Sequence, residues 1–182
     1  MREVSPVKLF AGLIAVCPSL FEAVKKRLEN EWGPVDCLSE IMDFNYTRYY
    51  EKEMGSPLYR QFISFANLID PGSLAFRKVF TNLLENELAG EGKRRVNIDP
   101  GYLTPAKLVL ATTKDRSHRI YLRDGIYAEV TLLYYRGKYE PLPWTYPDYR
   151  SEGYRRYFAR VREICLAQAK GFSLGDAERI GR

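Results

Sequence analysis

Apolar positions in the first hundred residues alternate between strand-like and helix-like spacing. Residues 7–16 form a continuous β-rich apolar run, which predicts a buried central strand. The following residues carry an apolar stripe at helical spacing that ends at Gly33 and Pro34. Residues 40–46 and 58–65 are predicted as two further strands.

A second helix is predicted after Asp70, because Asp70 suits the N-cap position and Pro71 the first helical position. Residues 95–99 alternate in polarity and predict a fourth strand. The order strand-helix-strand-strand-helix-strand predicts an α+β fold with a ferredoxin-like βαββαβ core and a mainly antiparallel sheet. The stripe expected to bury the second helix is Phe76, Val79, Phe80, Leu83 and Leu84.

Two short motifs shape the next segment. Asp99-Pro100-Gly101 predicts a type II turn, in which proline presets one torsion and glycine supplies the positive one. Thr104-Pro105 repeats the cap-plus-proline signal and predicts a short helix that runs through Ala111.

A β-hairpin is predicted from residues 118–122 and 126–135. A two-residue loop at Asp124-Gly125 would mix polar and apolar side chains on both faces of the hairpin. A three-residue loop over 123–125, with Gly125 in the left-handed conformation, separates them and is preferred. That register pairs Arg119 with Glu129, Ile120 with Ala128, Tyr121 with Tyr127 and Leu122 with Ile126.

The C-terminal part is predicted as an extension of the core. A further strand over 138–142 is followed by a helix that starts near Ser151 and buries an aromatic stripe. The chain is expected to form a single domain over 1–182, with the ferredoxin-like half at 1–99, the hairpin and helix at 100–170 and a flexible tail at 171–182.

The composition favours an anionic ligand without indicating a dedicated nucleic-acid binder. The formal net charge is +5, but acidic residues are spread among the basic ones. The 14 tyrosines suit half-buried sheet faces and ligand pockets alike, because each ring carries one polar tip. Three widely spaced cysteines indicate buried thiols and a cytoplasmic location. No membrane partner is expected, since the apolar run at 9–16 is too short to span a bilayer.

The predicted short helix supplies the first candidate site. Lys107 lies in its first turn, where a cation is unfavourable unless an anion is nearby. Thr112, Thr113 and Lys114 place two hydroxyls and an ammonium at its far end. The plainer alternatives are that Lys107 reaches solvent or pairs with Asp99, and that Lys114 occupies an ordinary helix end.

The predicted hairpin supplies the second candidate site. Arg119, Tyr121 and Glu129 share one face, which is either a polar pocket wall or a solvated face with a cross-strand ion pair. His118 faces Val130 in that register, and such a histidine is more often a hydrogen-bonded core residue than a catalyst. Asp99, Glu129 and His118 are the candidate catalytic groups.

Other features leave the chemistry open. The scattered carboxylates have no metal-ligand spacing, so the metal is unknown and magnesium is the ion considered. The aromatic loop 144–149 is expected to plug the sheet edge, or else to act as a lid or base-stacking surface. The P-loop and the other common catalytic signatures are absent from the sequence.

Several long motifs carry a family resemblance. At residues 97–104, 107–114, 118–122, 125–130 and 144–149 the chain resembles a family of short bacterial and archaeal proteins, the domain of unknown function number four-four-one-six. The similarity extends to residues 49–55 and 62–70 and so covers the full length. The resemblance implies a prokaryotic cytoplasmic protein and no particular activity.

These observations predict binding of a phosphorylated small molecule or nucleotide. Lys107, Thr112, Thr113, Lys114, Arg119 and Tyr121 would contact the ligand, and Asp99 or Glu129 would act as base or magnesium ligand if the protein is an enzyme. Replacing Lys107 with alanine is expected to abolish stabilisation by anions. The alternatives are a noncatalytic RNA-binding or assembly module that stacks bases on sheet tyrosines, and a scaffold in which the polar segment only holds the hairpin.

Overall fold

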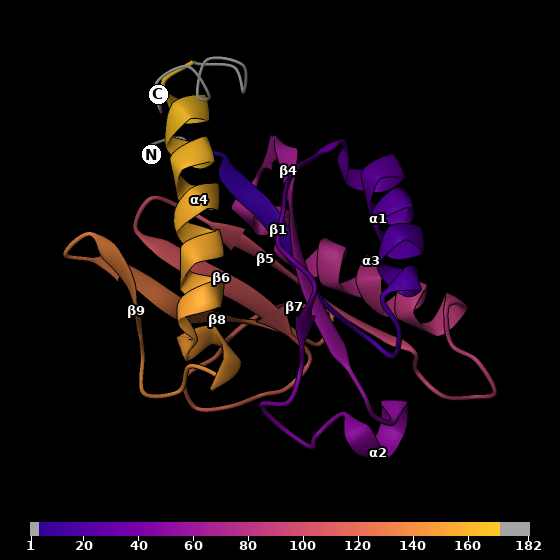
Figure 1. Cartoon of the computed structure of the whole chain (residues 1–182). Helices are drawn as coiled ribbons and strands as arrows, with labels where there is room; N and C mark the ends of the chain where they lie inside the picture. The colour runs from indigo at the N-terminus through magenta and orange to yellow at the C-terminus, as the bar shows by residue number, and fades with distance from the viewer. Residues whose placement is uncertain (1–3, 172–182) are drawn as a thin grey trace.

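The computed structural model describes residues 4–171, and its central element is the apolar run near the N-terminus (Figure 1). This run forms β1 (Val7–Ala15), in which every residue is buried. It pairs with β4 (Tyr59–Ile69) on one side and with β5 (Val96–Leu103) on the other. A strand covered on both faces has no solvent-facing polar side, which is why its sequence is apolar apart from Lys8, whose ammonium is buried in an ion pair with Asp36.

The strands form one mainly antiparallel sheet. In the described part of the chain it has nine strands, with the order β2-β4-β1-β5-β6-β8-β7, while β3 pairs with β4 and β9 with β8. The remaining strands are β2 (Val35–Leu38), β3 (Met42–Asp43), β6 (Lys107–Thr112), β7 (Ile120–Arg123), β8 (Ile126–Tyr135) and β9 (Lys138–Pro141).

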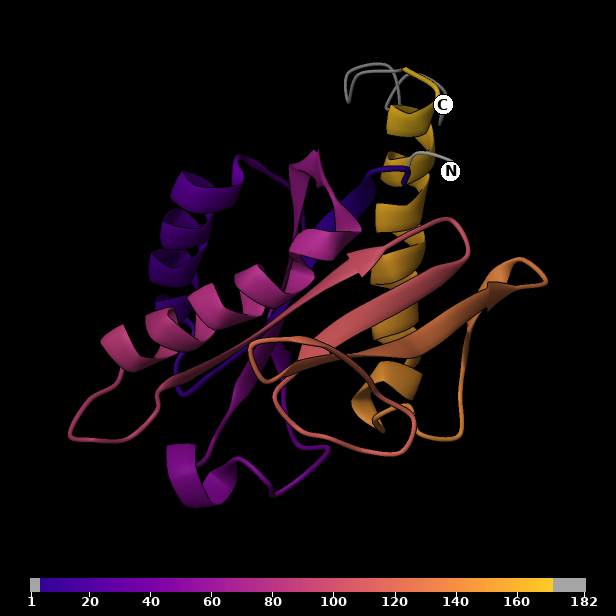
Figure 2. The same ribbon diagram turned by 180° about the vertical axis from the view of Figure 1, so that it is seen from behind.

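Helices cover both faces of the sheet. Figure 2 shows α1 (Ser19–Trp32) and α3 (Leu74–Glu87) together on one face, and Figure 1 shows α4 (Glu152–Ala169) across the other. The short α2 (Glu51–Met54) lies below the sheet in Figure 1. Two single-turn 3₁₀ helices, Pro71–Ser73 and Asp148–Arg150, precede α3 and α4.

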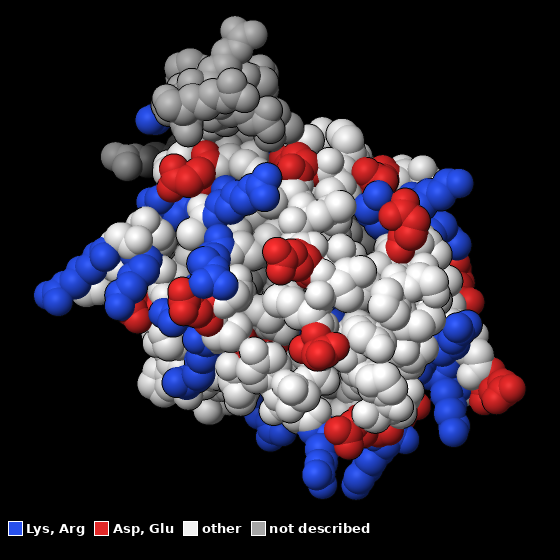
Figure 3. All heavy atoms as spheres, viewed as in Figure 1, with Lys and Arg blue, Asp and Glu red and all other residues white. Residues whose placement is uncertain are grey.

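The face that carries α4 has charges of both signs. Figure 3 shows Lys and Arg side chains interspersed with Asp and Glu side chains on it, instead of a single basic stripe. None of the helices within residues 4–171 combines the length and apolar character needed to cross a membrane.

Two local predictions are confirmed. Ser151 caps α4 by accepting a hydrogen bond from the Tyr154 amide, and the helix buries Tyr157, Phe158 and Val161 as expected. Asp70 likewise caps the turn before α3 by accepting from the Gly72 amide at 2.8 Å. Both capping bonds join residues two or three apart in the sequence, so they form independently of distant contacts.

The predicted hairpin register is correct except at the turn. Ile120 pairs with Ala128 and Tyr121 with Tyr127, but a bulge then pairs Arg123 with Ile126. The predicted pairing of Leu122 with Ile126 is therefore wrong. The turn is the two-residue Asp124-Gly125, with φ of 52° and 72°, and the bulge lets this turn coexist with the register that sorts the faces.

The predicted turn at Asp99-Pro100-Gly101 is wrong, because these residues lie inside β5. Gly101 is required there by packing: a Cβ would come within 2.5 Å of the Phe10 ring and of the Val109 carbonyl. The glycine thus permits a close approach between strands and supplies no positive φ.

The predicted helix after Thr104-Pro105 is also wrong, because residues 107–112 form β6. The Thr104 amide donates to the Lys107 carbonyl at 2.9 Å, and the Thr104 hydroxyl accepts from the Lys107 amide at 3.1 Å. The same threonine-proline pair that begins a helix also suits a tight turn, and here it connects β5 to β6. Lys107 therefore has no helix dipole to oppose.

Two further predictions need correction. The strand expected at 40–46 is reduced to the two-residue β3, and a separate strand, β2, precedes it at 35–38. The buried face of α3 is rotated from the predicted stripe: Phe76 and Leu83 are exposed, whereas Lys78 and Glu85 are buried. The predicted tail from residue 172 onward lies outside the described residues.

Candidate ligand pocket

The pocket begins where two neighbouring strands part. β5 and β6 pair only from Gly101 with Leu110 to Leu103 with Leu108. Beyond that point β5 continues beside β1, and β6 continues beside β8. The sheet is therefore forked between β5 and β6.

Side chains from α3 take the place of the missing strand partner. The Ile98 carbonyl accepts from the Lys78 ammonium at 2.8 Å, and the Ile98 amide donates to the Glu85 carboxylate at 2.7 Å. Buried backbone groups need such partners, so two charged residues are buried on the helix face where an apolar stripe was expected. This requirement explains the rotation of α3.

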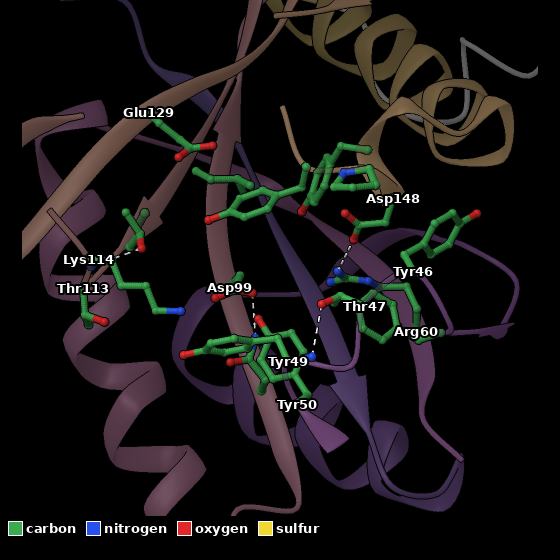
Figure 4. A pocket seen from close by; sticks show the side chains of 18 of the residues that line it. Tyr46, Thr47, Tyr49, Tyr50, Arg60, Asp99, Thr113, Lys114, Glu129 and Asp148 are labelled. Carbon is green, nitrogen blue, oxygen red and sulfur yellow. Dashed lines mark hydrogen bonds and ion pairs between the residues drawn. The ribbon is translucent and has the colours of Figure 1, made fainter. Parts of the chain in front are cut away.

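A pocket of about 470 Å³ occupies the fork, and Figure 4 shows its lining. This volume lies in the range of small-molecule sites. The lining comes from the parted ends of β5 and β6, from α3, from residues 44–50 and from the aromatic loop at 146–149. In Figure 4, Thr113 and Lys114 lie on one side, Arg60 and Asp148 on the other, and Asp99 between them.

A charged network forms the floor near β5. Lys78 contacts Asp99 at 3.1 Å, and the Asn97 amide donates to Asp99 at 2.6 Å. Burial alone would raise the pKa of Asp99, but Lys78 and other nearby cations outweigh it and hold the pKa below its ordinary value. Arg94 joins the network through Glu85 at 3.1 Å and Asn97 at 2.8 Å. Burial is the largest influence on Glu85 and raises its pKa.

A buried ion pair forms the opposite side. Arg60 donates to Asp148 at 2.6 Å, and the two side chains are 4% and 7% exposed. The guanidinium lies 5.0 Å from the Phe44 ring and 5.1 Å from the Phe62 ring. Burial is the largest influence and lowers the pKa of Arg60, but Asp148 together with Tyr149, Tyr154 and Asp99 raises the pKa above its ordinary value. Within the described part of the chain the Arg60 Nε and Nη1 atoms have no hydrogen-bond partner.

Glu129, on β8 of the hairpin, forms a third wall of the pocket. It accepts from Arg119 at 2.7 Å and lies 3.2 Å from the His118 Nε2 atom. Arg119 also donates to the Tyr146 hydroxyl at 2.6 Å, and His118 stacks on Trp144 with ring centroids 5.1 Å apart. Burial, the largest influence, raises the pKa of Tyr146. The hairpin and the aromatic loop are thereby joined behind the pocket.

The residues that follow β6 carry an ammonium group at the exposed mouth of the pocket. Lys114 places its Nζ atom 3.8 Å from the centroid of the Tyr49 ring. Across residues 4–171 it makes no ion pair, whereas Arg60, Lys78 and Arg94, the other cations of the lining, each contact a carboxylate. Thr112 and Thr113 line the same side.

Five of the predicted site residues line this pocket, although the predicted helix is a strand. They are Asp99, Thr112, Thr113, Lys114 and Glu129.

The other four predicted residues do not line the pocket. Arg119 and His118 lie behind Glu129 and orient it. Lys107 lies at the start of β6, opposite Leu133, and Tyr121 is 57% exposed on the edge strand β7. The His118 ring contacts Glu129 and Trp144, and its predicted pairing with Val130 lies outside the ladder because β7 begins at Ile120.

Sequence reasoning missed several lining residues. Arg60 lies within an apolar strand, and Lys78 lies on a helix that otherwise suggests an apolar stripe. A charged residue within an apolar segment could have indicated a polar site, because a buried charge needs a partner from elsewhere in the chain. The segment at 44–50 gave no such signal, since its tyrosines also suit a surface loop.

The lining does not fit a protein-held metal ion well. Among the residues that the structure describes, no three His, Cys, Asp or Glu side chains are grouped as metal ligands. Asp99, Asp148 and Glu129 are each already paired with a basic side chain. We therefore assign no chemical step to magnesium.

Comparison with known proteins identifies a family. A family model described as "Domain of unknown function (DUF4416)" matches residues 5–164, which confirms the resemblance seen in the sequence. No curated protein matches the chain, and no solved structure does.

Proposed function

The chain belongs to the DUF4416 family, and we propose that its forked-sheet pocket binds a phosphorylated small molecule or nucleotide. The single observation that carries this proposal is the state of Lys114. It is the lining cation whose charge has no carboxylate partner in the described part of the chain, and it stands at the mouth of the pocket. An unneutralised ammonium beside two threonine hydroxyls suits a phosphate group.

The aromatic side of the pocket supports a ligand with a ring. Tyr46, Tyr49 and Tyr50 line it from one segment, and Tyr146 lines it from the aromatic loop. Aromatic side chains stack on nucleobases and contribute affinity. A nucleotide combines a ring for this side with phosphates for Lys114.

The carboxylate of Asp99 supports phosphate-directed chemistry as an extension of binding. Its pKa is held below the ordinary value, so it is ionised at neutral pH and can accept a hydrogen bond from a ligand hydroxyl. Glu129 is fixed by Arg119 at 2.7 Å and is better suited to holding the wall than to moving a proton. Binding is the proposal, and catalysis by Asp99 depends on it.

A thermal-denaturation screen tests the proposal. Adenosine triphosphate, sugar phosphates and tripolyphosphate are each added, because a ligand that binds the folded state raises the melting temperature. Lys114→Ala should weaken the effective ligand by about tenfold, since a charge-assisted hydrogen bond contributes about 1.5 kcal/mol or more. Lys107→Ala is the matched control and should leave the stabilisation unchanged. Equal effects of the two variants, or no stabilisation by any compound, would contradict the proposal.

A second candidate function is a noncatalytic RNA-binding module. It is favoured by Tyr121, which is 57% exposed and lies 5.3 Å from the Tyr127 ring on the hairpin. This function requires RNA affinity that falls steeply with salt and depends on Tyr121. Tyr121 does not line the pocket that holds Lys114, and we favour the small-molecule pocket as the site.

We also propose a finer description of the fold and the cellular location. The order β2-β4-β1-β5, with α1 and α3 as the crossovers, supports a ferredoxin-like core in a single domain. The cysteines at 17, 37 and 165 are free, and two of them are buried, which supports a reducing cytoplasm.

A further inference from the structure

The register of the fork determines which backbone groups face the pocket. The Thr104 amide bonds to the Lys107 carbonyl, and Tyr102 pairs with Val109. Because backbone groups alternate along a strand, even-numbered residues of β5 and odd-numbered residues of β6 face each other. Continuing this register places residue 100 opposite residue 111, and residue 98 opposite residue 113.

Pro100 leaves one backbone acceptor open. A ladder would have residue 100 donate to the Ala111 carbonyl, but proline has no amide hydrogen. The Ala111 carbonyl therefore receives no hydrogen bond from β5. Ala111 lines the pocket at the point where β6 parts from β5.

Thr113 leaves one backbone donor open. Its partner in a continued ladder would be Ile98, whose amide and carbonyl are taken by Glu85 and Lys78. Within residues 4–171 the Thr113 amide has no hydrogen-bond partner, although Thr113 lines the pocket. An acceptor on residue 111 and a donor on residue 113, the residue directly after β6, therefore lie next to each other at the end of this strand.

We infer that this strand edge recognises a nucleobase whose own edge offers a donor beside an acceptor. Adenine has this pattern in its amino group and adjacent ring nitrogen, and cytosine has it as well. Hypoxanthine and guanine reverse it, because both present a carbonyl acceptor beside a protonated ring nitrogen. The inference rests on the proposed nucleotide function and narrows it to adenine- or cytosine-type bases.

The surroundings agree with this assignment. Ala111 is 3% exposed, so an unmatched polar group opposite its carbonyl would lose its hydrogen bond to water, whereas Thr113 is exposed. Lys114 follows directly at the mouth and would hold the phosphates. The carboxylate of Asp99, which lies between the two sides in Figure 4, is then available to the ribose hydroxyls.

The first test uses two ligands of nearly equal shape and the unchanged protein. Adenosine triphosphate and inosine triphosphate differ only on this edge of the base, where donor and acceptor are exchanged. Adenosine triphosphate should bind at least about tenfold more tightly, because inosine triphosphate leaves two protein groups unpaired. Tripolyphosphate serves as the base-free probe.

The second test gives the Ala111 carbonyl a hydrogen-bond donor from the protein's own backbone. Pro100→Ala supplies an amide hydrogen that can donate to the Ala111 carbonyl and extend the ladder. It should weaken adenosine triphosphate binding about threefold to tenfold, the effect of one lost hydrogen bond, and leave tripolyphosphate binding unchanged. Pro105→Ala, at the exposed turn of the same hairpin, is the control and should change neither.

The outcomes separate this inference from the proposed function. If tripolyphosphate and both nucleotides bind equally well, the pocket binds phosphate and the base inference is wrong. If none of the three binds, the proposed function is wrong and the inference falls with it. A preference for inosine triphosphate, or a Pro100→Ala variant that keeps the full preference for adenosine triphosphate, would also overturn the inference.

Discussion

Two ends of the same sheet face are built in opposite ways. Under α4, Phe10, Leu132 and Phe158 are fully buried and pack with other apolar side chains. At the forked end, Arg60 and Asp148 bury opposite charges against aromatic rings. Burying an ion pair stabilises a fold no better than apolar residues of similar volume would. Lys8 and Asp36 also bury an ion pair, next to Gln168 of α4, so a buried ion pair alone does not mark a ligand site. Arg60 and Asp148 differ because they line a pocket, and we infer that the forked end is kept polar for a ligand.

The largest expected effect is at the α4 end. Phe158 is fully buried, with its ring 5.0 Å from those of Phe10 and Phe62. Phe158→Ala should lower the free energy of unfolding by about 3 to 5 kcal/mol, because it removes an aromatic ring and leaves a cavity. Denaturant titration measures the loss. A loss below about 1 kcal/mol would show that this end does not hold the fold.

A smaller loss of stability is expected at the forked end. Asp148→Asn keeps an oxygen for the bond from Arg60 but leaves the buried guanidinium without its countercharge. We expect a loss of about 2 kcal/mol, less than for full removal of a buried partner, because the hydrogen bond survives. The double variant Arg60→Met with Asp148→Leu should recover much of that loss in denaturant titrations. If the double variant is less stable than Asp148→Asn, the pair is structural and the comparison fails.

A change at the mouth should affect binding more than stability. Tyr49→Leu removes the ring beneath Lys114, which lies 3.8 Å from it. We expect affinity for adenosine triphosphate to fall about twofold to fivefold, the effect of an exposed cation–π contact of about 0.5 to 1 kcal/mol. Tyr135→Leu is the matched control, because Tyr135 contacts Arg136 outside the pocket. Titration calorimetry should separate the two variants, and equal losses would remove Tyr49 from the site.

The smallest expected effect is a pH dependence at Asp99. Its pKa is held below the ordinary 3.8, so its charge stabilises the fold above that pH and the stabilisation is lost as pH falls through the folded value. The side chain is 25% exposed, so solvent screening keeps the effect small. The difference in melting temperature between the wild-type protein and Asp99→Asn should shrink below about pH 4. A difference that grows on acidification would contradict this sign.

The sequence predicted the elements whose signals are local. Ser151 and Asp70 cap their helical segments with nearby amides, and Tyr121 pairs with Tyr127 because that register sorts polar from apolar side chains. The strand at 7–16 was predicted correctly because a doubly covered strand is mainly apolar, although Lys8 within it is buried against Asp36.

The errors arose where distant residues decide the structure. Asp99-Pro100-Gly101 favours a turn locally, but Gly101 packs against Phe10 of β1 and Pro100 lies where β5 leaves β6. Lys78 is buried because Ile98 needs a partner for its carbonyl. No pattern within one segment contains this information.

Several residues of the candidate site were predicted correctly, but the secondary structure that brings them together was not. Lys114 and Asp99 do line the pocket, but they meet at the fork of two strands and not across a helix and a turn. Arg60 was missed because its partner, Asp148, is 88 residues away in the sequence.

The Thr113 amide offers the most direct measurement of the central claim, that the forked end is a nucleotide pocket. Its proton resonance and hydrogen-exchange rate can be followed by NMR with and without adenosine triphosphate. The account predicts that this amide shifts and becomes protected on saturation, and that Lys114→Ala raises the concentration required. No change at Thr113, with perturbations confined to the β7 edge around Tyr121, would contradict the account and favour the RNA-binding alternative.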